Sequence, residues 1–306
     1  MRIAFAGSAE FSLPSLRALA GAGHEVVVVL TAPERVGDRG RPAPRPVRDL
    51  AAELGLPVAQ PERLTATAVS ELESARAELL VVSAYGQLLR KPVLEAFPLG
   101  AWGVHPSLLP RHRGASPIAS TILGGDPTTG VTIYAMDERM DAGPILAQVE
   151  LPVAPRATTP VLADQLAQAG ADLLLRTLTR YEAGAVVPTP QDETQATYSH
   201  KLSRADAAVC WSAPAVQIDR LVRALQPWPG AVCQLGGTTV KLLEGEPLPA
   251  AGEAASPGSL VGTVGESVKI ATGEGAYLVH LVQPPSARSM TPAAFLRGRR
   301  RSARAG

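Results

Sequence analysis

The stretch HEVVVVLT, residues 24–31, decides the fold class, because its five central residues are all apolar. A strand with one face in water alternates apolar and polar residues, whereas a strand buried on both faces is apolar throughout. Strands of the second kind belong to mostly parallel sheets whose faces are covered by helices. The stretch therefore predicts an α/β domain.

Neighbouring segments extend this prediction. Three further short apolar runs predict strands at residues 2–7, 79–84 and 131–135. Leucines spaced by three residues predict a helix over residues 13–20, and a longer helix is expected over about residues 160–182. Strands that alternate with helices indicate βαβ units, so we expect a Rossmann-like, mostly parallel sheet over residues 1–185.

The second part of the chain has a different pattern. Residues 186–208 are polar and marked by prolines, which predicts an ordered linker. Short strand candidates separated by glycines then follow at residues 231–235, 240–243, 261–264, 268–271 and 276–282. This spacing predicts a small β-barrel domain over residues 209–306.

Composition restricts the cellular setting. The 306 residues are 46% hydrophobic and 19% charged, which is typical of a globular protein. The two cysteines, Cys210 and Cys233, have no metal-ligand spacing and suit a reducing compartment. The sequence has no secretory signal pattern and no apolar run of the roughly 20 residues that span a bilayer, so we expect a cytoplasmic protein without a membrane partner.

Charge is distributed unevenly. Residues 1–200 contain 17 Lys and Arg against 21 Asp and Glu, whereas residues 201–306 contain 12 against 7. A basic C-terminal part suggests a polyanionic partner, and a solvated basic tail explains the same excess equally well.

The strongest candidate for chemistry lies in GVHPSLLPRHRGASPI, residues 103–118. His105 ends a short apolar run, and ligands of open α/β sheets bind at the carboxyl ends of strands. Asp141 follows the strand at residues 131–135, in MDERMDAGPIL. A carboxylate there could orient the imidazole and favour its protonated form. The alternative is that His105 only caps a turn and Asp141 only starts one.

Both segments resemble the folate-dependent formyltransferase family. The family pattern runs Asn-x-His, SLLP, RG and a later Pro, and residues 136–146 resemble its segment with the catalytic aspartate. The stretches AYGQLLRKPVL (84–94), QDETQATYSHKLS (191–203) and LQPWPGA (225–231) resemble the branch of the family that acts on tRNA. The resemblance covers essentially the whole chain.

The resemblance implies a formyltransferase fold with a C-terminal OB-like barrel. It also implies formyl transfer from 10-formyltetrahydrofolate to the amino group of methionine on initiator tRNA, for translation initiation. His105 would stabilise the charge on the formyl oxygen or relay a proton, and Asp141 would hold His105 and help to remove the amine proton. We also expect a monomer and no metal.

Binding residues follow from the same resemblance. The folate site is expected at Tyr85, Gly86, Gln87, Leu88, Leu89, Ser107, Leu108, Leu109 and Pro110. Contacts with tRNA are expected from a basic loop and from the linker, at Arg35, Arg39, Arg41, Arg45, Lys201 and Arg204.

Two positions depart from the family. Gly103 stands where the family has its catalytic asparagine, and Cys210 precedes Trp211 where an aspartate is usual. The carboxamide that would bond the formyl oxygen is therefore absent, and one such donor contributes about 10²–10³ in rate. Either water or another donor fills the gap, or the chain transfers poorly. If the place is empty, Gly103→Asn should raise transfer by roughly tenfold.

Three functions therefore stay open at this point. The first is the active tRNA-directed transferase. The second is a protein that binds tRNA and folate with negligible chemistry because of Gly103. The third is an enzyme that hydrolyses 10-formyltetrahydrofolate or formylates a sugar or nucleotide amine, which the basic C-terminal part argues against.

Overall fold

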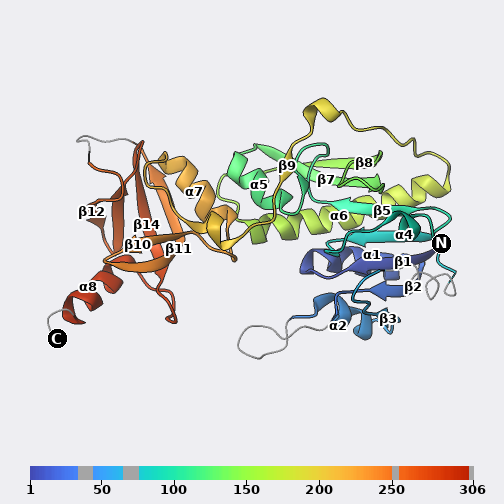
Figure 1. Cartoon of the computed structure of the whole chain (residues 1–306), viewed down its shortest axis with the longest axis horizontal. Coiled ribbons are helices and arrows are strands. Elements are labelled where there is room, and N and C mark those ends of the chain that lie inside the picture. Colours follow the sequence, from blue (N-terminus) through green and yellow to red (C-terminus); the bar gives the residue numbers. More distant parts are fainter. Residues whose placement is uncertain (34–43, 65–75, 250–254, 303–306) are drawn as a thin grey trace. The chain divides into compact units, whose positions relative to one another are not determined.

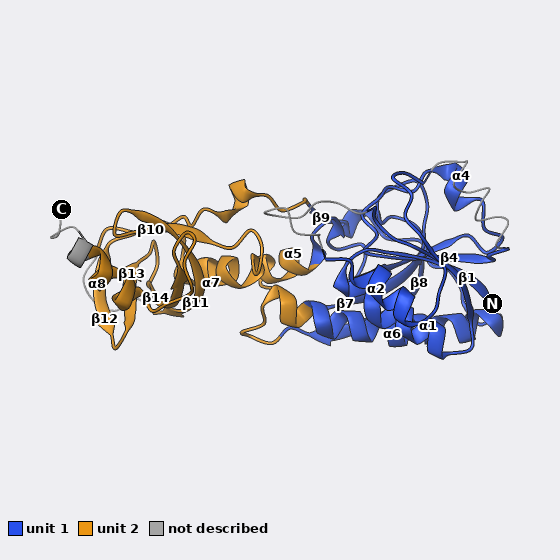
Figure 2. Ribbon diagram, turned by 90° about the horizontal axis from the view of Figure 1, so that it is seen from below, with its two compact units in different colours: residues 1–117, 128–153, 163–199 blue, residues 118–127, 154–162, 200–306 orange. Residues whose placement is uncertain are grey.

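The computed structural model describes residues 1–33, 44–64, 76–249 and 255–302. The chain forms two compact units (Figure 2). The N-terminal unit comprises residues 1–117, 128–153 and 163–199, and the C-terminal unit comprises residues 118–127, 154–162 and 200–306.

A seven-stranded sheet forms the centre of the N-terminal unit (Figure 1). Its strands are β1 (Arg2–Gly7), β2 (Glu25–Leu30), β3 (Val58–Ala59), β4 (Leu79–Ser83), β5 (Ala101–His105), β7 (Thr128–Ala135) and β8 (Ile145–Pro152). They lie in the order β3-β2-β1-β4-β5-β7-β8, parallel from β3 to β5 and antiparallel beyond. The predicted mostly parallel sheet is confirmed.

Helices cover this sheet, as the apolar strands require. They are η1 (Glu10–Ser12), α1 (Leu13–Gly21), α2 (Pro46–Glu53), α4 (Lys91–Leu94) and α6 (Thr159–Glu182). Leu79, Leu80 and Val81 follow one another in β4, and none has any exposed surface. Since successive side chains in a strand point to opposite faces, both faces of β4 are buried. The helices predicted at residues 13–20 and 160–182 are confirmed as α1 and α6.

The C-terminal unit contains a five-stranded antiparallel sheet. Its strands are β10 (Val232–Leu235), β11 (Thr238–Leu248), β12 (Leu260–Val264), β13 (Ser267–Ala271) and β14 (Ala276–Gln283), paired in the order β10-β11-β14-β13-β12. The helical elements of this unit are α5 (Pro117–Gly124), η4 (Arg204–Ala207), α7 (Ala215–Ala224) and α8 (Pro292–Ser302). All five strands predicted from the glycine-separated runs are confirmed.

The linker segment is ordered by pairing with a loop of the N-terminal unit. It contains η3 (Glu193–Gln195) and β9 (Tyr198–Ser199). Strand β9 pairs in parallel with β6 (Arg113–Gly114), which lies in the loop that follows His105. This pairing places the linker beside the histidine loop, although about 80 residues separate them in sequence.

Parallel pairing brings strand ends together at one edge of the sheet. Strands β1, β4 and β5 run in the same direction, so Gly7, Ser83 and His105 end at the same edge. Ligands of such sheets bind at this edge.

No helix within the described residues has the length and apolar character needed to cross a membrane.

Candidate active site

Two chain segments bring His105 and Asp141 together. His105 is the last residue of β5, and Asp141 lies in the turn between β7 and β8. His105 Nδ1 and Asp141 Oδ2 are 3.7 Å apart, and both side chains are largely buried. Asp141 has a left-handed backbone with φ of 51°, a conformation that aspartate tolerates better than most residues. The predicted pairing of the two side chains is present.

The loop after β5 fixes the orientation of the imidazole. His105 Nε2 lies 3.0 Å from the carbonyl oxygen of His112. A carbonyl only accepts, so Nε2 carries a proton and donates it, and Nδ1 is the nitrogen that faces Asp141. Ser107 strengthens the same loop by donating from Oγ to the Arg111 carbonyl at 2.6 Å. Nδ1 is therefore the ring nitrogen that lies beside the Asp141 carboxylate.

The Asp141 carboxylate is held by donors on both of its oxygens. Tyr134 donates from its hydroxyl to Oδ1 at 2.7 Å, and the Gly114 amide donates to Oδ2 at 2.7 Å. Burial first, and then the neighbouring carboxylate, raise the pKa of the Tyr134 phenol well above its ordinary value. The phenol therefore keeps its proton and remains a donor.

Gly114 has a conformation that only glycine adopts easily. Its φ is 108°, and a Cβ added to it would overlap the Ser199 carbonyl oxygen. Because no side chain intervenes, its N–H approaches Asp141 while β6 remains paired with β9. The RG segment noted in the sequence thus supplies a backbone donor to the site.

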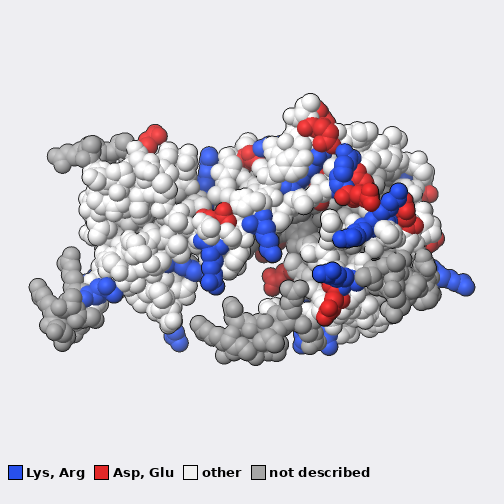
Figure 3. Space-filling view, viewed as in Figure 1, with Lys and Arg blue, Asp and Glu red and all other residues white. Residues whose placement is uncertain are grey.

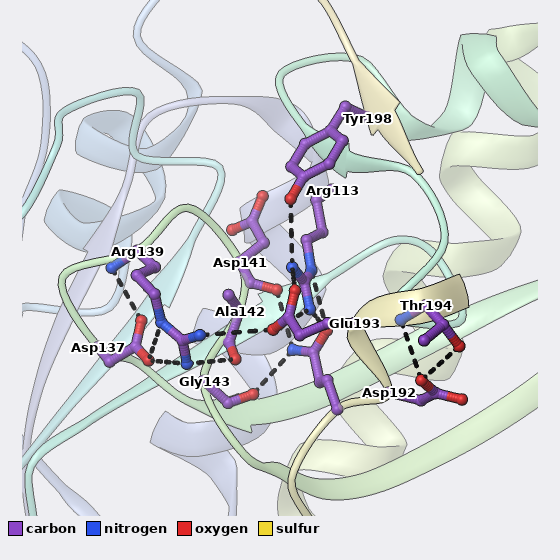
Figure 4. A network of polar contacts seen from close by, with 11 residues as sticks. Arg113, Asp137, Arg139, Asp141, Ala142, Gly143, Asp192, Glu193, Thr194 and Tyr198 are labelled. Atoms are coloured by element: carbon purple, nitrogen blue, oxygen red, sulfur yellow. Dashed lines mark hydrogen bonds and ion pairs between the residues drawn. The ribbon is translucent and has the colours of Figure 1, made fainter. Parts of the chain in front are cut away.

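A buried arginine links the histidine loop to the linker (Figure 4). Arg113 is 1% exposed, and its guanidinium donates to Glu193 at 2.8 and 3.2 Å and to Gln191 Oε1 at 2.8 and 3.0 Å. Gln191 Nε2 in turn donates to the carbonyls of Asp141 and Gly143, at 2.9 and 2.8 Å. The linker therefore fastens the turn that carries the catalytic aspartate candidate.

The network continues to the edge of the turn. Arg139 donates to Asp137 at 2.7 Å and to the Ala142 carbonyl at 3.2 Å, and it reaches Glu193 at 3.4 Å. The hydrogen bond from Arg113 lowers the pKa of the Glu193 carboxyl below its ordinary value. Glu193 is therefore ionised where the buried guanidinium needs a counter-charge.

The residues predicted for folate binding lie in two loops. In the segment after β4, the side chains of Tyr85 and Leu89 are buried and Leu88 is 72% exposed. Gly86 is left-handed with φ of 79°, and Gln87 bonds the main chain of Pro61 and Leu64.

The second loop follows His105. Ser107 is fully buried, and Leu108 packs beside Gly130 of β7. Leu109 donates its N–H to Thr132 Oγ1 at 3.1 Å, and Pro110 accepts from the Thr197 N–H at 3.2 Å. These contacts tie the loop to β7 and to the linker.

The residues predicted for RNA binding are only partly described. Arg35, Arg39 and Arg41 lie outside the described residues. Arg45 directly precedes α2, and Lys201 and Arg204 are exposed. On the face shown in Figure 3, basic and acidic side chains of the N-terminal unit are interspersed rather than separated by sign.

The second departure from the family lies in the C-terminal unit. Cys210 is exposed, and its Sγ lies 3.0 Å from Ser212 Oγ. Trp211 packs against the core of the same unit.

Within the described residues, no group of three or more His, Cys, Asp or Glu side chains could hold a metal ion.

Sequence reasoning missed Tyr134, Gln191 and the role of Arg113. Tyr134 stands in a strand that the apolar pattern predicted, where an aromatic residue is unremarkable. The available signal was Gly103 itself, because a glycine inside a strand marks close approach by another group. The partners of Arg113 gave no signal, since their distance in sequence hides the contact.

Comparison with known proteins identifies the family. Residues 1–178 match the family described as "Formyl transferase", and residues 201–300 match "Formyl transferase, C-terminal domain". The chain belongs to the formyl transferase family. It is 43% identical to the methionyl-tRNA formyltransferase of Heliobacterium modesticaldum over 98% of both chains. It is 44% identical to the methionyl-tRNA formyltransferase of Roseiflexus castenholzii, over 97% of this chain and 96% of that one.

A solved structure shares the fold. HypX from Aquifex aeolicus, in complex with tetrahydrofolic acid, aligns with a TM-score of 0.66 at 21% identity over 97% of this chain. The chain spans 47% of the length of HypX. At this identity the likeness concerns the fold.

The contacts of Arg113 predict a dependence of stability on this one side chain. Arg113→Lys keeps the charge but loses the planar set of donors that reaches Gln191 and Glu193 together. We expect unfolding to become easier by about 1–3 kcal/mol, since buried polar groups lose partners. Chemical denaturation of parent and variant measures this, and equal midpoints would contradict the role of Arg113.

The same network predicts a dependence on pH. Because the pKa of Glu193 is lowered in the folded chain, its contribution to stability is present above the usual glutamate pKa of about 4.3 and disappears as the pH falls through the folded value. Melting temperatures of the parent and of Glu193→Gln should therefore differ at neutral pH and converge in acid. The control is Glu138→Gln, which replaces an exposed carboxylate in the turn between β7 and β8. A difference that stays constant with pH would exclude the proposed pairing.

Proposed function

We propose that this chain transfers the formyl group of 10-formyltetrahydrofolate to the amino group of methionyl initiator tRNA. The observation that carries the proposal is the His105–Asp141 pair at the carboxyl edge of the sheet, in a chain 43–44% identical to proteins named methionyl-tRNA formyltransferase. Translation initiation with these substrates takes place in the cytoplasm, which is the expected location.

The reaction sets two electrostatic requirements. The amine nitrogen attacks the formyl carbon, so negative charge develops on the formyl oxygen and positive charge on the nitrogen. The tetrahedral intermediate then collapses as the bond from the formyl carbon to the folate nitrogen breaks, and tetrahydrofolate leaves with a proton on that nitrogen. A donor must face the oxygen, and a base must take the amine proton. His105 and Asp141 lie 3.7 Å apart, close enough to serve both tasks at one carbon atom.

The hydrogen bonds of the site assign these tasks. Asp141 is an acceptor whose two oxygens are already oriented, so it suits removal of the amine proton. His105 has Nδ1 directed towards the carboxylate and Nε2 bonded to His112. A positive imidazole ring beside the reacting carbon would stabilise the negative charge that develops on the formyl oxygen.

The loop at residues 84–89 fits a flat, partly apolar substrate such as folate. Ala84 and Gly86 have left-handed backbones, which turn the chain sharply beyond β4. Leu88 is exposed, and apolar contact with a ring would bury it. We propose that this loop and residues 107–110 hold the folate.

Recognition of tRNA would rest on the arginines of the segment 35–45 and on two linker residues. Lys201 and Arg204 are exposed and can reach phosphate oxygens. Contacts between these cations and phosphates would supply affinity that decreases as salt increases.

A direct assay tests the proposed reaction. Labelled formate, converted to 10-formyltetrahydrofolate, should be incorporated into charged initiator tRNA by the parent chain. His105→Ala and Asp141→Asn should each lower single-turnover transfer by roughly three orders of magnitude, because both residues act on the transition state.

A second histidine provides the matched control. His24 precedes β2 and therefore lies at the amino edge of the sheet. His24→Ala should leave transfer within about threefold of the parent. If His105→Ala also stays within that range while its melting temperature is unchanged, the catalytic assignment is wrong.

RNA binding is tested through its dependence on salt. Replacing Arg39 and Arg41 by Ala should weaken binding of initiator tRNA and flatten the plot of log affinity against log salt. Each lost phosphate contact should reduce the slope by about one. A weaker affinity with an unchanged slope would show that these arginines do not contact phosphates.

A further inference from the structure

Gly103 leaves room for a neighbouring side chain. It lies inside β5, and its φ falls outside the left-handed region, so its backbone does not require glycine. A Cβ added at this position would overlap Tyr134 Cε1 and lie 2.6 Å from Cζ and 2.8 Å from the hydroxyl oxygen. Any side chain at residue 103 would therefore collide with the tyrosine ring.

The register of two strands explains why this ring lies there. Gly103 on β5 is paired directly with Tyr134 on β7, so the two residues share one face of the sheet. Tyr134 is 3% exposed and meets the His105 ring edge to face, with ring centroids 6.5 Å apart. Its hydroxyl extends past Gly103 to Asp141. The ring thus occupies the space beside the two catalytic candidates.

We propose that Tyr134 is a positioning residue for formyl transfer, and that Gly103 is its necessary partner. The Tyr134 hydroxyl holds the Asp141 carboxylate in front of His105, from the place where the family motif has an asparagine side chain. This inference rests on the proposed function.

The orientation of the carboxylate makes this contact important. Asp141 Oδ2 faces both the Gly114 amide and His105, whereas Oδ1 is held by Tyr134. The last torsion of an aspartate side chain is broad, so a carboxylate held at one oxygen can rotate. The second donor restricts that rotation and keeps Oδ2 directed at the imidazole.

The filled space reverses the expectation for Gly103→Asn. An empty place would have allowed the new carboxamide to reach the formyl oxygen. In the structure the asparagine Cβ meets the Tyr134 ring, and the ring must move away from Asp141 to admit it. Gly103→Asn alone should therefore lower transfer.

Tyr134→Phe tests the hydroxyl, because it keeps the ring. We expect kcat to fall about tenfold to a hundredfold, the effect of a small misplacement of a reacting group, while KM for both substrates changes by less than about threefold. Tyr277→Phe is the matched control, since Tyr277 is fully buried in the C-terminal unit and its hydroxyl has no hydrogen-bond partner among the described residues. A Tyr134→Phe enzyme with the parent's kcat would overturn the inference.

A double-mutant cycle tests the shared space. Gly103→Asn, Tyr134→Val and the double variant should be compared by transfer and by melting temperature. We expect the double variant to melt higher and to transfer at least about fivefold faster than Gly103→Asn alone, since removing the ring gives the carboxamide room. Effects that simply add would show that residues 103 and 134 do not compete.

The parent chain separates this inference from the proposed function. If the parent transfers no formyl group, the proposed function fails, and the positioning role fails with it. The melting temperatures of the cycle still decide whether the ring and residue 103 compete. If the parent is active and Tyr134→Phe equals it, only the positioning role fails.

Discussion

The candidate active site depends on the Asp141 carboxylate, which has one oxygen directed at the His105 imidazole. Two donors fix the Asp141 carboxylate, the Gly114 amide and the Tyr134 hydroxyl, and each comes from a different part of the chain. The Gly114 amide reaches it because β6 pairs with β9 of the linker. The Asp141 main chain is held by Gln191, which is itself bound by Arg113. The linker is therefore part of the structure that orients the candidate catalytic pair.

Periodicity predicted the parts of this arrangement that depend on burial. The uniformly apolar run at residues 24–31 identified a sheet covered on both faces, and such a sheet binds ligands at its carboxyl edge. His105 could be proposed because it ends a strand of the parallel part of the sheet, and Asp141 because it follows a strand in sequence. Strand β7 runs antiparallel to β5, so the edge rule alone does not bring Asp141 to His105. What the pattern could not supply was register. Gly103 faces Tyr134 because β7 returns antiparallel to β5, and nothing in either segment specifies that pairing. Contacts such as Arg113 with Glu193 are equally invisible, since both side chains are ordinary surface types in sequence.

At Gly103, the absence of the family asparagine has to be considered together with the side chain that fills its space. From sequence alone, glycine in place of the family asparagine indicates a lost donor, which leaves open whether another group replaces it or the chain transfers poorly. The structure shows that the volume at this position is occupied by Tyr134, whose hydroxyl enters the same site. Protein interiors are close-packed, so a small residue in a buried strand usually has a large neighbour across from it. Gly103 and Tyr134 therefore fill one space together, so the place of the family asparagine is not empty in this chain.

The Tyr134 phenol and an asparagine carboxamide also differ in how many hydrogen bonds they can donate. A carboxamide has two donor hydrogens, so it can bond one group and still offer a hydrogen to the formyl oxygen. A phenol has one hydrogen, and in this chain that hydrogen goes to Asp141 at 2.7 Å. Tyr134 therefore cannot hold the carboxylate and stabilise the oxyanion at the same time. Under the proposed mechanism, the charge on the formyl oxygen must then be met by a group other than Tyr134, and His105 is the candidate that lies beside Asp141.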